Sequence, residues 1–185
     1  MSDRSGLIES IIGNGREYRV LHNVRIPVVT SETMEKNRSL CMTNKCHCYN
    51  SSWTCPPNCG SPEYCMGRIQ ECRDADIYIR TFRNVDFSDD AAVTAMMDGF
   101  RHECREIMTE CRKRGYDVFA LADGPCKYCE RCTVYDGKEC PYPEMQVPSV
   151  SGYGIDMGAY IPSIGEQFSF SKDSVTLYGV FLYKE

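Results

Sequence analysis

The chain has 185 residues, a net charge of −5 at neutral pH and a hydrophobic fraction of 42%. This length suits a single domain, 1–185, with a real core. The negative charge gives the surface as a whole no attraction for nucleic acid or anionic membranes. No apolar run is long enough to span a bilayer, and the start of the chain has no signal-peptide layout, so a cytoplasmic protein is expected.

Helices and strands alternate in the predicted order of elements. We expect helices over 7–12, 31–40, 62–73 and 88–114, and strands over 18–26, 76–82, 116–122, 167–170 and 174–183. Ser88 is the predicted N-cap of the longest helix, and a strand lies on each side of that helix. These three elements predict a βαβ unit with parallel strands and a right-handed crossover. The predicted fold class is α/β, with mixed α+β as the alternative, and the last two strands are expected to form a hairpin on the same sheet.

Thirteen cysteines are the unusual feature of the composition. Disulfides rarely persist in a reducing cytosol, and the count is odd, so metal ligation is the leading explanation. The clustered cysteines fall in two segments, 41–65 and 124–141. Because exposed thiols are prone to oxidation, their number also favours an oxygen-poor habitat.

The second segment contains the stronger motif, CKYCERCTVYDGKECP over 126–141. Its spacing is C-x2-C-x2-C-x7-C-P, which resembles the opening and the final proline of bacterial ferredoxin motifs. The predicted ligands of a [4Fe–4S] cluster are Cys126, Cys129, Cys132 and Cys140. Zinc bound by the same four thiolates is one alternative, and a redox-active C-x-x-C pair is another.

Two residues near the motifs are candidates for contact with the metal group. Gly124 follows a predicted strand and is expected to allow a positive φ or a close backbone approach to the cluster, with an ordinary turn as the alternative. Trp53, together with Tyr49, is expected to form an apolar lid beside the metal, with simple packing in the core as the alternative.

The first segment has no helical or strand period, and a loop of this length usually needs something to hold it. Its candidate metal ligands are Cys41, Cys46, Cys48, Cys55 and Cys59, with Cys65 on the next helix. Four of these six thiols are enough for a second metal centre, or they join the later cluster in one larger centre. Helical spacing makes Cys65, Cys72, Cys104 and Cys111 resemble small core residues.

The combination of W-x-C-P-P at 53–57 with G-P-C-x2-C-x2-C at 124–132 and Cys140-Pro141 resembles the predicted metal-binding family named domain of unknown function 2284. The resemblance extends from about Cys41 to the end of the sequence. It implies a cysteine-bound metal centre in a largely anaerobic group of bacteria and archaea, with no established reaction. It also implies that Cys46 and Cys55 are ligands together with the four later cysteines.

Three functions remain open at this stage. A cluster with four thiolate ligands has no open iron, so we expect an electron carrier that works with a redox partner protein. A catalytic iron–sulfur enzyme is the second hypothesis, although no general acid, base or nucleotide-binding loop is found. A zinc-binding structural or metal-handling module without redox activity is the third. The sequence does not indicate an oligomeric state.

Overall fold

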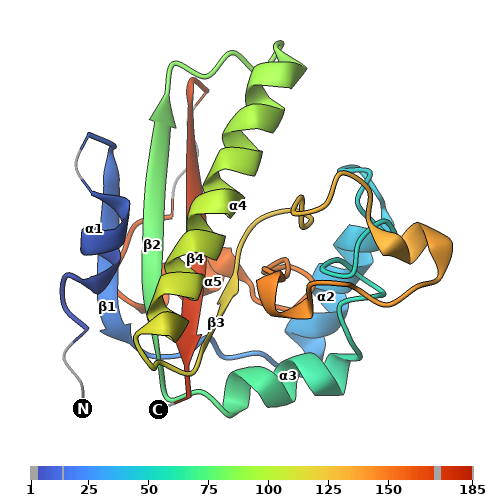
Figure 1. Cartoon of the computed structure of the whole chain (residues 1–185), viewed down its shortest axis with the longest axis horizontal. Helices are drawn as coiled ribbons and strands as arrows, with labels where there is room; N and C mark the ends of the chain where they lie inside the picture. Colours follow the sequence, from blue (N-terminus) through green and yellow to red (C-terminus); the bar gives the residue numbers. More distant parts are fainter. Residues whose placement is uncertain (1–3, 14, 169–171, 185) are drawn as a thin grey trace.

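The computed structural model describes residues 4–13, 15–168 and 172–184, and a four-stranded sheet forms its centre (Figure 1). The strands, in spatial order, are β1 (Tyr18–Val24), β2 (Asp74–Arg83), β4 (Ser174–Tyr183) and β3 (Val118–Leu121). Every neighbouring pair is antiparallel. The fold class is therefore mixed α+β.

The predicted strand–helix–strand unit is present, but its two strands are not neighbours. Helix α4 (Asp90–Lys113) connects β2 to β3. These strands run in the same direction because both are antiparallel to β4, which lies between them. The parallel direction was therefore predicted correctly, whereas the insertion of β4 between the strands was not foreseen.

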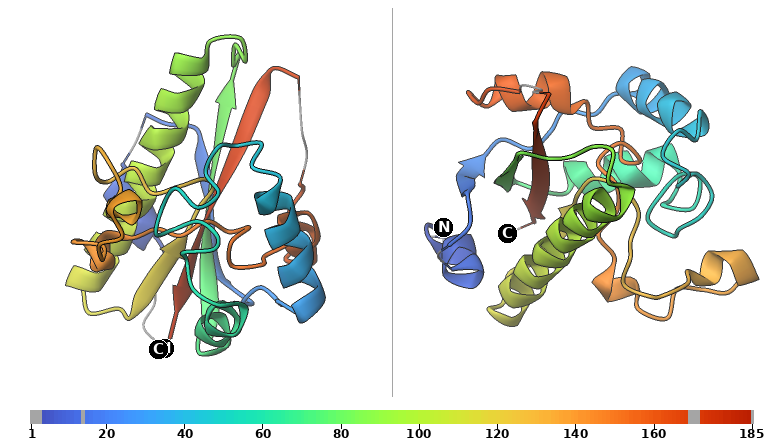
Figure 2. Two further views of the ribbon diagram at one scale, coloured as in Figure 1. Left: turned by 90° about the vertical axis from the view of Figure 1, so that its right-hand side faces the viewer. Right: turned by 90° about the horizontal axis from the view of Figure 1, so that it is seen from above.

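Helices cover both faces of the sheet (Figure 2). One face packs against α4 and α1 (Leu7–Ile12). The other face packs against α2 (Ser31–Met42), α3 (Pro62–Gln70) and α5 (Met157–Ser163). Within the described part of the chain, no helix combines the length and apolarity needed to cross a membrane.

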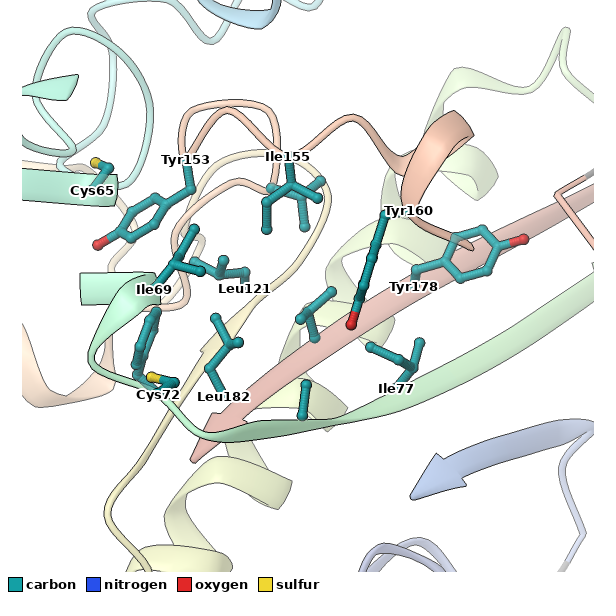
Figure 3. Packing of buried hydrophobic residues seen from close by; sticks show 14 of the residues in the cluster. Cys65, Ile69, Cys72, Ile77, Leu121, Tyr153, Ile155, Tyr160, Tyr178 and Leu182 are labelled. Carbon is teal, nitrogen blue, oxygen red and sulfur yellow. The ribbon is translucent and has the colours of Figure 1, made fainter. Parts of the chain in front are cut away.

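Alternate residues of the central strands enter opposite core layers. In β3, Val118 and Ala120 belong to the α4 layer, and Phe119 and Leu121 belong to the α3 and α5 layer. Figure 3 shows part of the second layer, where side chains from α3 and α5 lie over the sheet. Because both faces are buried, these strands read as nearly continuous apolar runs in the sequence.

Several predicted boundaries change in the structure. The N-cap of α4 is Asp89, whose carboxylate accepts from the Ala92 N–H, and not Ser88. Helix α5 and the short 3-10 helices Thr133–Asp136 and Pro143–Met145 lie where no regular structure was expected. Of the first arm of the predicted hairpin, residues 169–170 lie outside the described residues, while 167–168 form no strand.

The two cysteine-rich segments lie side by side on the β3 side of the sheet (Figures 1 and 2). The 124–141 segment begins just after β3, where Ala122 forms an isolated bridge with Ser149. The 41–65 segment leaves the end of α2 and returns to the fold through α3. Helices α2 and α3 therefore hold the two ends of the first loop, β3 holds the start of the second, and the two loops lie against each other.

Candidate metal centre

Thr54 ties the two cysteine-rich segments together. It is fully buried, and its Oγ1 accepts from the Cys126 N–H at 2.7 Å. Its backbone oxygen accepts from the Ser149 N–H at 3.0 Å. The W-x-C-P-P part of the first loop is thereby held against the first cysteine of the second loop.

The four thiols of the stronger motif come together in the structure. A narrow cavity of about 20 Å³ is lined by Cys126, Cys129, Cys132 and Cys140. The pKa of the Cys129 thiol is raised by burial and, to a lesser degree, by its neighbours Cys126, Cys140 and Cys132. The structure therefore brings these four cysteines around one cavity, and their role as metal ligands stays a prediction.

Aromatic side chains surround this group, which we call the later cysteine centre. Trp53 lines the same cavity, and its Nε1–H donates to Thr133 Oγ1 at 3.1 Å. Tyr128 and Tyr142 meet edge to face at 5.1 Å and remain about half exposed. Trp53 thus forms an apolar wall beside the later cysteines, whereas the sequence placed it with Tyr49 beside a metal of the first loop. Tyr49 lies at a separate cavity lined by first-loop cysteines.

A buried arginine from α4 contacts the later cysteine centre. Arg105 is only 5% exposed, and its Nη2 donates to Cys126 Sγ at 3.5 Å. Its Nε donates to the Met145 backbone oxygen at 2.9 Å, and its guanidinium lies 5.1 Å from the Tyr128 ring centroid. Arg105 therefore places a buried positive charge directly against a thiol of the later cysteine centre.

A second group of four thiols surrounds a larger cavity of about 470 Å³. The cysteines that line it are Cys41, Cys46, Cys48 and Cys55. Burial raises the pKa of Cys48 to about 11 and that of Cys55 to about 12, and Cys46 contributes to both shifts. The pKa of Cys41 is also raised, by burial and then by Cys46. Cys46 is thus a common neighbour of the other three thiols.

Cys59 has a different environment from the other candidate ligands of the first loop. It does not line the 470 Å³ cavity. It lies beside Cys65, and Arg38 Nη2 is 3.7 Å from Cys59 Sγ and 3.3 Å from Cys65 Sγ. Cys72, Cys104 and Cys111 are buried in the core, as predicted. The structure therefore does not bring Cys59 together with the four thiols around the cavity.

Gly124 allows a second arginine of α4 to reach the larger cavity. Its φ is +80°, and a Cβ at this position would lie 2.3 Å from Arg101 Nη2. Arg101 is 5% exposed, pairs with Asp98 and donates from Nε to the Asp123 backbone oxygen at 2.7 Å. The prediction of a positive φ at Gly124 is confirmed. The group that approaches Gly124 most closely is the Arg101 guanidinium.

Sequence reasoning missed these arginines. Arg101 and Arg105 stand one helical turn apart, at positions that continue the apolar stripe of α4. Charged residues on such a stripe are rarely buried without a partner, and this was the available signal. Arg38, at the third cysteine group, sits on the weakly amphipathic α2, where no comparable signal exists.

The donor sets fit an iron–sulfur cluster or zinc, because both bind thiolates. Among the described residues, no three Cys, His, Asp or Glu side chains converge tightly enough to hold a single ion. The thiols of each group instead line a shared space, of about 20 Å³ for the later cysteines and about 470 Å³ for those of the first loop. A hollow of about 240 Å³ lies next to the later cysteine centre. It is lined by Cys126, Cys129 and Cys132 and also by Cys48 of the first loop.

Comparison with known proteins places this arrangement in a family. The model of the predicted metal-binding protein family DUF2284 matches residues 25–183. The chain belongs to this family. The matched range contains strands β2, β3 and β4 and every cysteine of both thiol groups, and β1 precedes it. DUF2284 thus provides a second indication of metal binding, and it does not identify the metal.

No match was found among the curated proteins or among the solved structures.

Proposed function

We propose that this DUF2284 protein binds a [4Fe–4S] cluster through Cys126, Cys129, Cys132 and Cys140 and transfers electrons in a reducing cytoplasm. The observation that carries the proposal is the gathering of these four thiols around one cavity, against the buried Arg105. Four thiolate ligands leave no iron open to substrate, and a bound cluster would supply a one-electron couple.

The residues around the later cysteine centre have separate roles in this proposal. Arg105 places a positive charge beside Cys126, which offsets the negative charge of the thiolates and favours the reduced state. Trp53 limits access of water to the thiols. The exposed edges of Tyr128 and Tyr142 offer a contact surface for a redox partner protein.

Metal analysis of protein purified without oxygen tests the cluster. A cubane at the later cysteine centre requires about four iron and four sulfide per chain at this site. Changing Cys129 and Cys132 to Ser should remove this iron, while a Cys72→Ala control should retain it, because Cys72 lies in the core away from both cavities. A colourless protein with stoichiometric zinc at these four thiols would make a structural or metal-handling module the better interpretation.

Voltammetry tests electron transfer. A reversible one-electron couple is expected, and Arg105→Gln should move it to lower potential without loss of iron, because a buried cation no longer stabilises the reduced state. Arg131→Gln removes the same charge from an exposed residue paired with Asp136, and solvent screening should make its shift much smaller. Equal shifts in both variants, or no couple above about −700 mV, the low end for such clusters, would count against the proposal.

A further inference from the structure

The first cysteine-rich loop encloses a cavity that the proposed function does not use. The cavity measures about 470 Å³, and four thiols line it together with Arg101, Met97 and Gly124. The wall of this cavity therefore combines four thiols, which are able to bind metal, with the positively charged side chain of Arg101. Such a donor set fits a group that binds several thiolates and carries negative charge.

The four thiols reach the cavity from positions that no simple spacing rule connects. Cys41 lies in the last turn of α2, Cys46 and Cys48 lie in the turns that follow, and Cys55 lies beyond Trp53. Cys48 Sγ donates to the Cys46 backbone oxygen at 2.9 Å, so this close pair is in direct contact. The sequence could not distinguish these four from Cys59 and Cys65, whereas the structure separates the two sets.

Arg101 is held in place as a wall of the cavity. Asp98 and the Asp123 backbone oxygen fix its guanidinium, and the missing side chain of Gly124 leaves the space that it occupies. Arg101 precedes Arg105 by four residues on α4, so the same helix supplies one buried cation to each thiol group. This repeated arrangement is a second observation, independent of the cysteines, that places a buried cation beside each group of thiols.

We infer that Cys41, Cys46, Cys48 and Cys55 hold a second iron–sulfur cluster, with Arg101 as its charge partner. The choice of these ligands stands on the cavity alone, and only the identity of the bound group rests on the proposed function. Cys59 and Cys65, which face each other and Arg38, are not ligands of this centre.

The two centres share a wall. Cys48 lines the larger cavity and also the 240 Å³ hollow beside Cys126, Cys129 and Cys132. Thr54 bonds to Cys126, and the next residue, Cys55, lines the larger cavity. A reduced partner protein can therefore deliver one electron to either cluster, and that electron can pass to the other cluster. The first cluster is then oxidised and the second is reduced, and no proton or further reactant is needed.

Iron and sulfide counts on protein purified without oxygen test this inference. The wild type should carry about eight iron and eight sulfide per chain, as two cubanes require. Cys46→Ser/Cys55→Ser and Cys129→Ser/Cys132→Ser should each retain about half. The Cys72→Ala control should retain all. Because the Cys46 side chain is exposed, Cys46→Ser alone should fold normally and still lose second-centre iron, even if the double variant misfolds.

Electron paramagnetic resonance of the reduced proteins gives a readout that does not depend on activity. Two neighbouring reduced clusters should produce a broadened, coupled signal in the wild type, and each half-loaded variant should show a simple uncoupled one. About four iron in the wild type, unchanged by Cys46→Ser, would overturn the second centre and leave the proposed function intact. Iron that survives Cys129→Ser/Cys132→Ser but is lost with Cys46→Ser would support the second centre and overturn the proposed function. Zinc in the larger cavity would overturn the assignment of an iron–sulfur cluster there.

Discussion

At the scale of single residues, arginine is as informative as cysteine in this protein. Arg38, Arg101 and Arg105 each lie against a different group of thiols. The positions of these arginines depend on which face of each helix packs against the loops. Cysteine spacing alone indicates the thiols, whereas the buried arginines are indicated only where they interrupt an apolar stripe, as Arg101 and Arg105 do on α4.

Gly124 is the residue at which the Arg101 arrangement can be tested. Gly124→Ala should destabilise the metal-free protein by about 2–4 kcal/mol, because it adds the cost of a positive φ to a collision with Arg101. Urea unfolding measures the difference. Gly137→Ala is the matched control: its φ is +63°, and no described atom lies within 4 Å of its added Cβ, so only the backbone cost of about 1 kcal/mol is expected. Equal losses in the two variants would contradict the close contact with Arg101.

At the scale of elements, the long helix was the easiest feature to predict. Its apolar residues recur at three- and four-residue intervals over most of Asp90–Lys113. Helix α5 was missed because its stretch is rich in proline and glycine, and it contains Pro162. Its formation depends on burial of Tyr160 and Ile161 against the sheet, which is a tertiary contact that local sequence does not report.

The contact between α4 and β4 is close enough to be tested by a single methyl group. A Cβ on Gly179 would lie 2.7 Å from Cys104 Sγ and 3.2 Å from the Phe181 ring. Gly179→Ala should therefore cost about 1–3 kcal/mol of stability, as overpacked cores do. Combining it with Cys104→Ala should recover part of that loss, since the smaller side chain makes room, and a double-mutant cycle in urea measures the coupling. Strictly additive effects would mean that helix and strand are farther apart than described.

At the scale of the whole molecule, the four strands of the sheet were each predicted from the sequence, but their arrangement was not. Pairing of β4 between β2 and β3 joins residues about a hundred positions apart, such as Ile77 and Val180. No local pattern encodes such a partner. In the same way, no local pattern shows that Cys59 lies beside Arg38 of α2 instead of lining the larger cavity.

The division into a sheet scaffold and two cysteine loops predicts where metal removal acts. Apart from the helical ends of 41–65 and one short 3-10 helix in 124–141, neither loop has regular structure, so bound metal should restrain both. Chelated protein should be cut by trypsin at the exposed Lys45, Lys127, Arg131 and Lys138 at least about tenfold faster than loaded protein. Cleavage at Arg80 inside β2 should stay slow in both forms, which mass spectrometry can follow. Identical loop cleavage with and without metal would show that the loops are rigid on their own.

The position of β4 in the sheet has a consequence for biosynthesis. All thirteen cysteines precede Ser174, the first residue of the strand that joins β2 to β3. During translation, every thiol leaves the ribosome before the strand that fixes the base of the second loop is available. Nascent chains therefore present flexible, unprotected thiols, and a cell that makes this protein needs either to keep oxidants away from them or to deliver metal only after β4 has inserted.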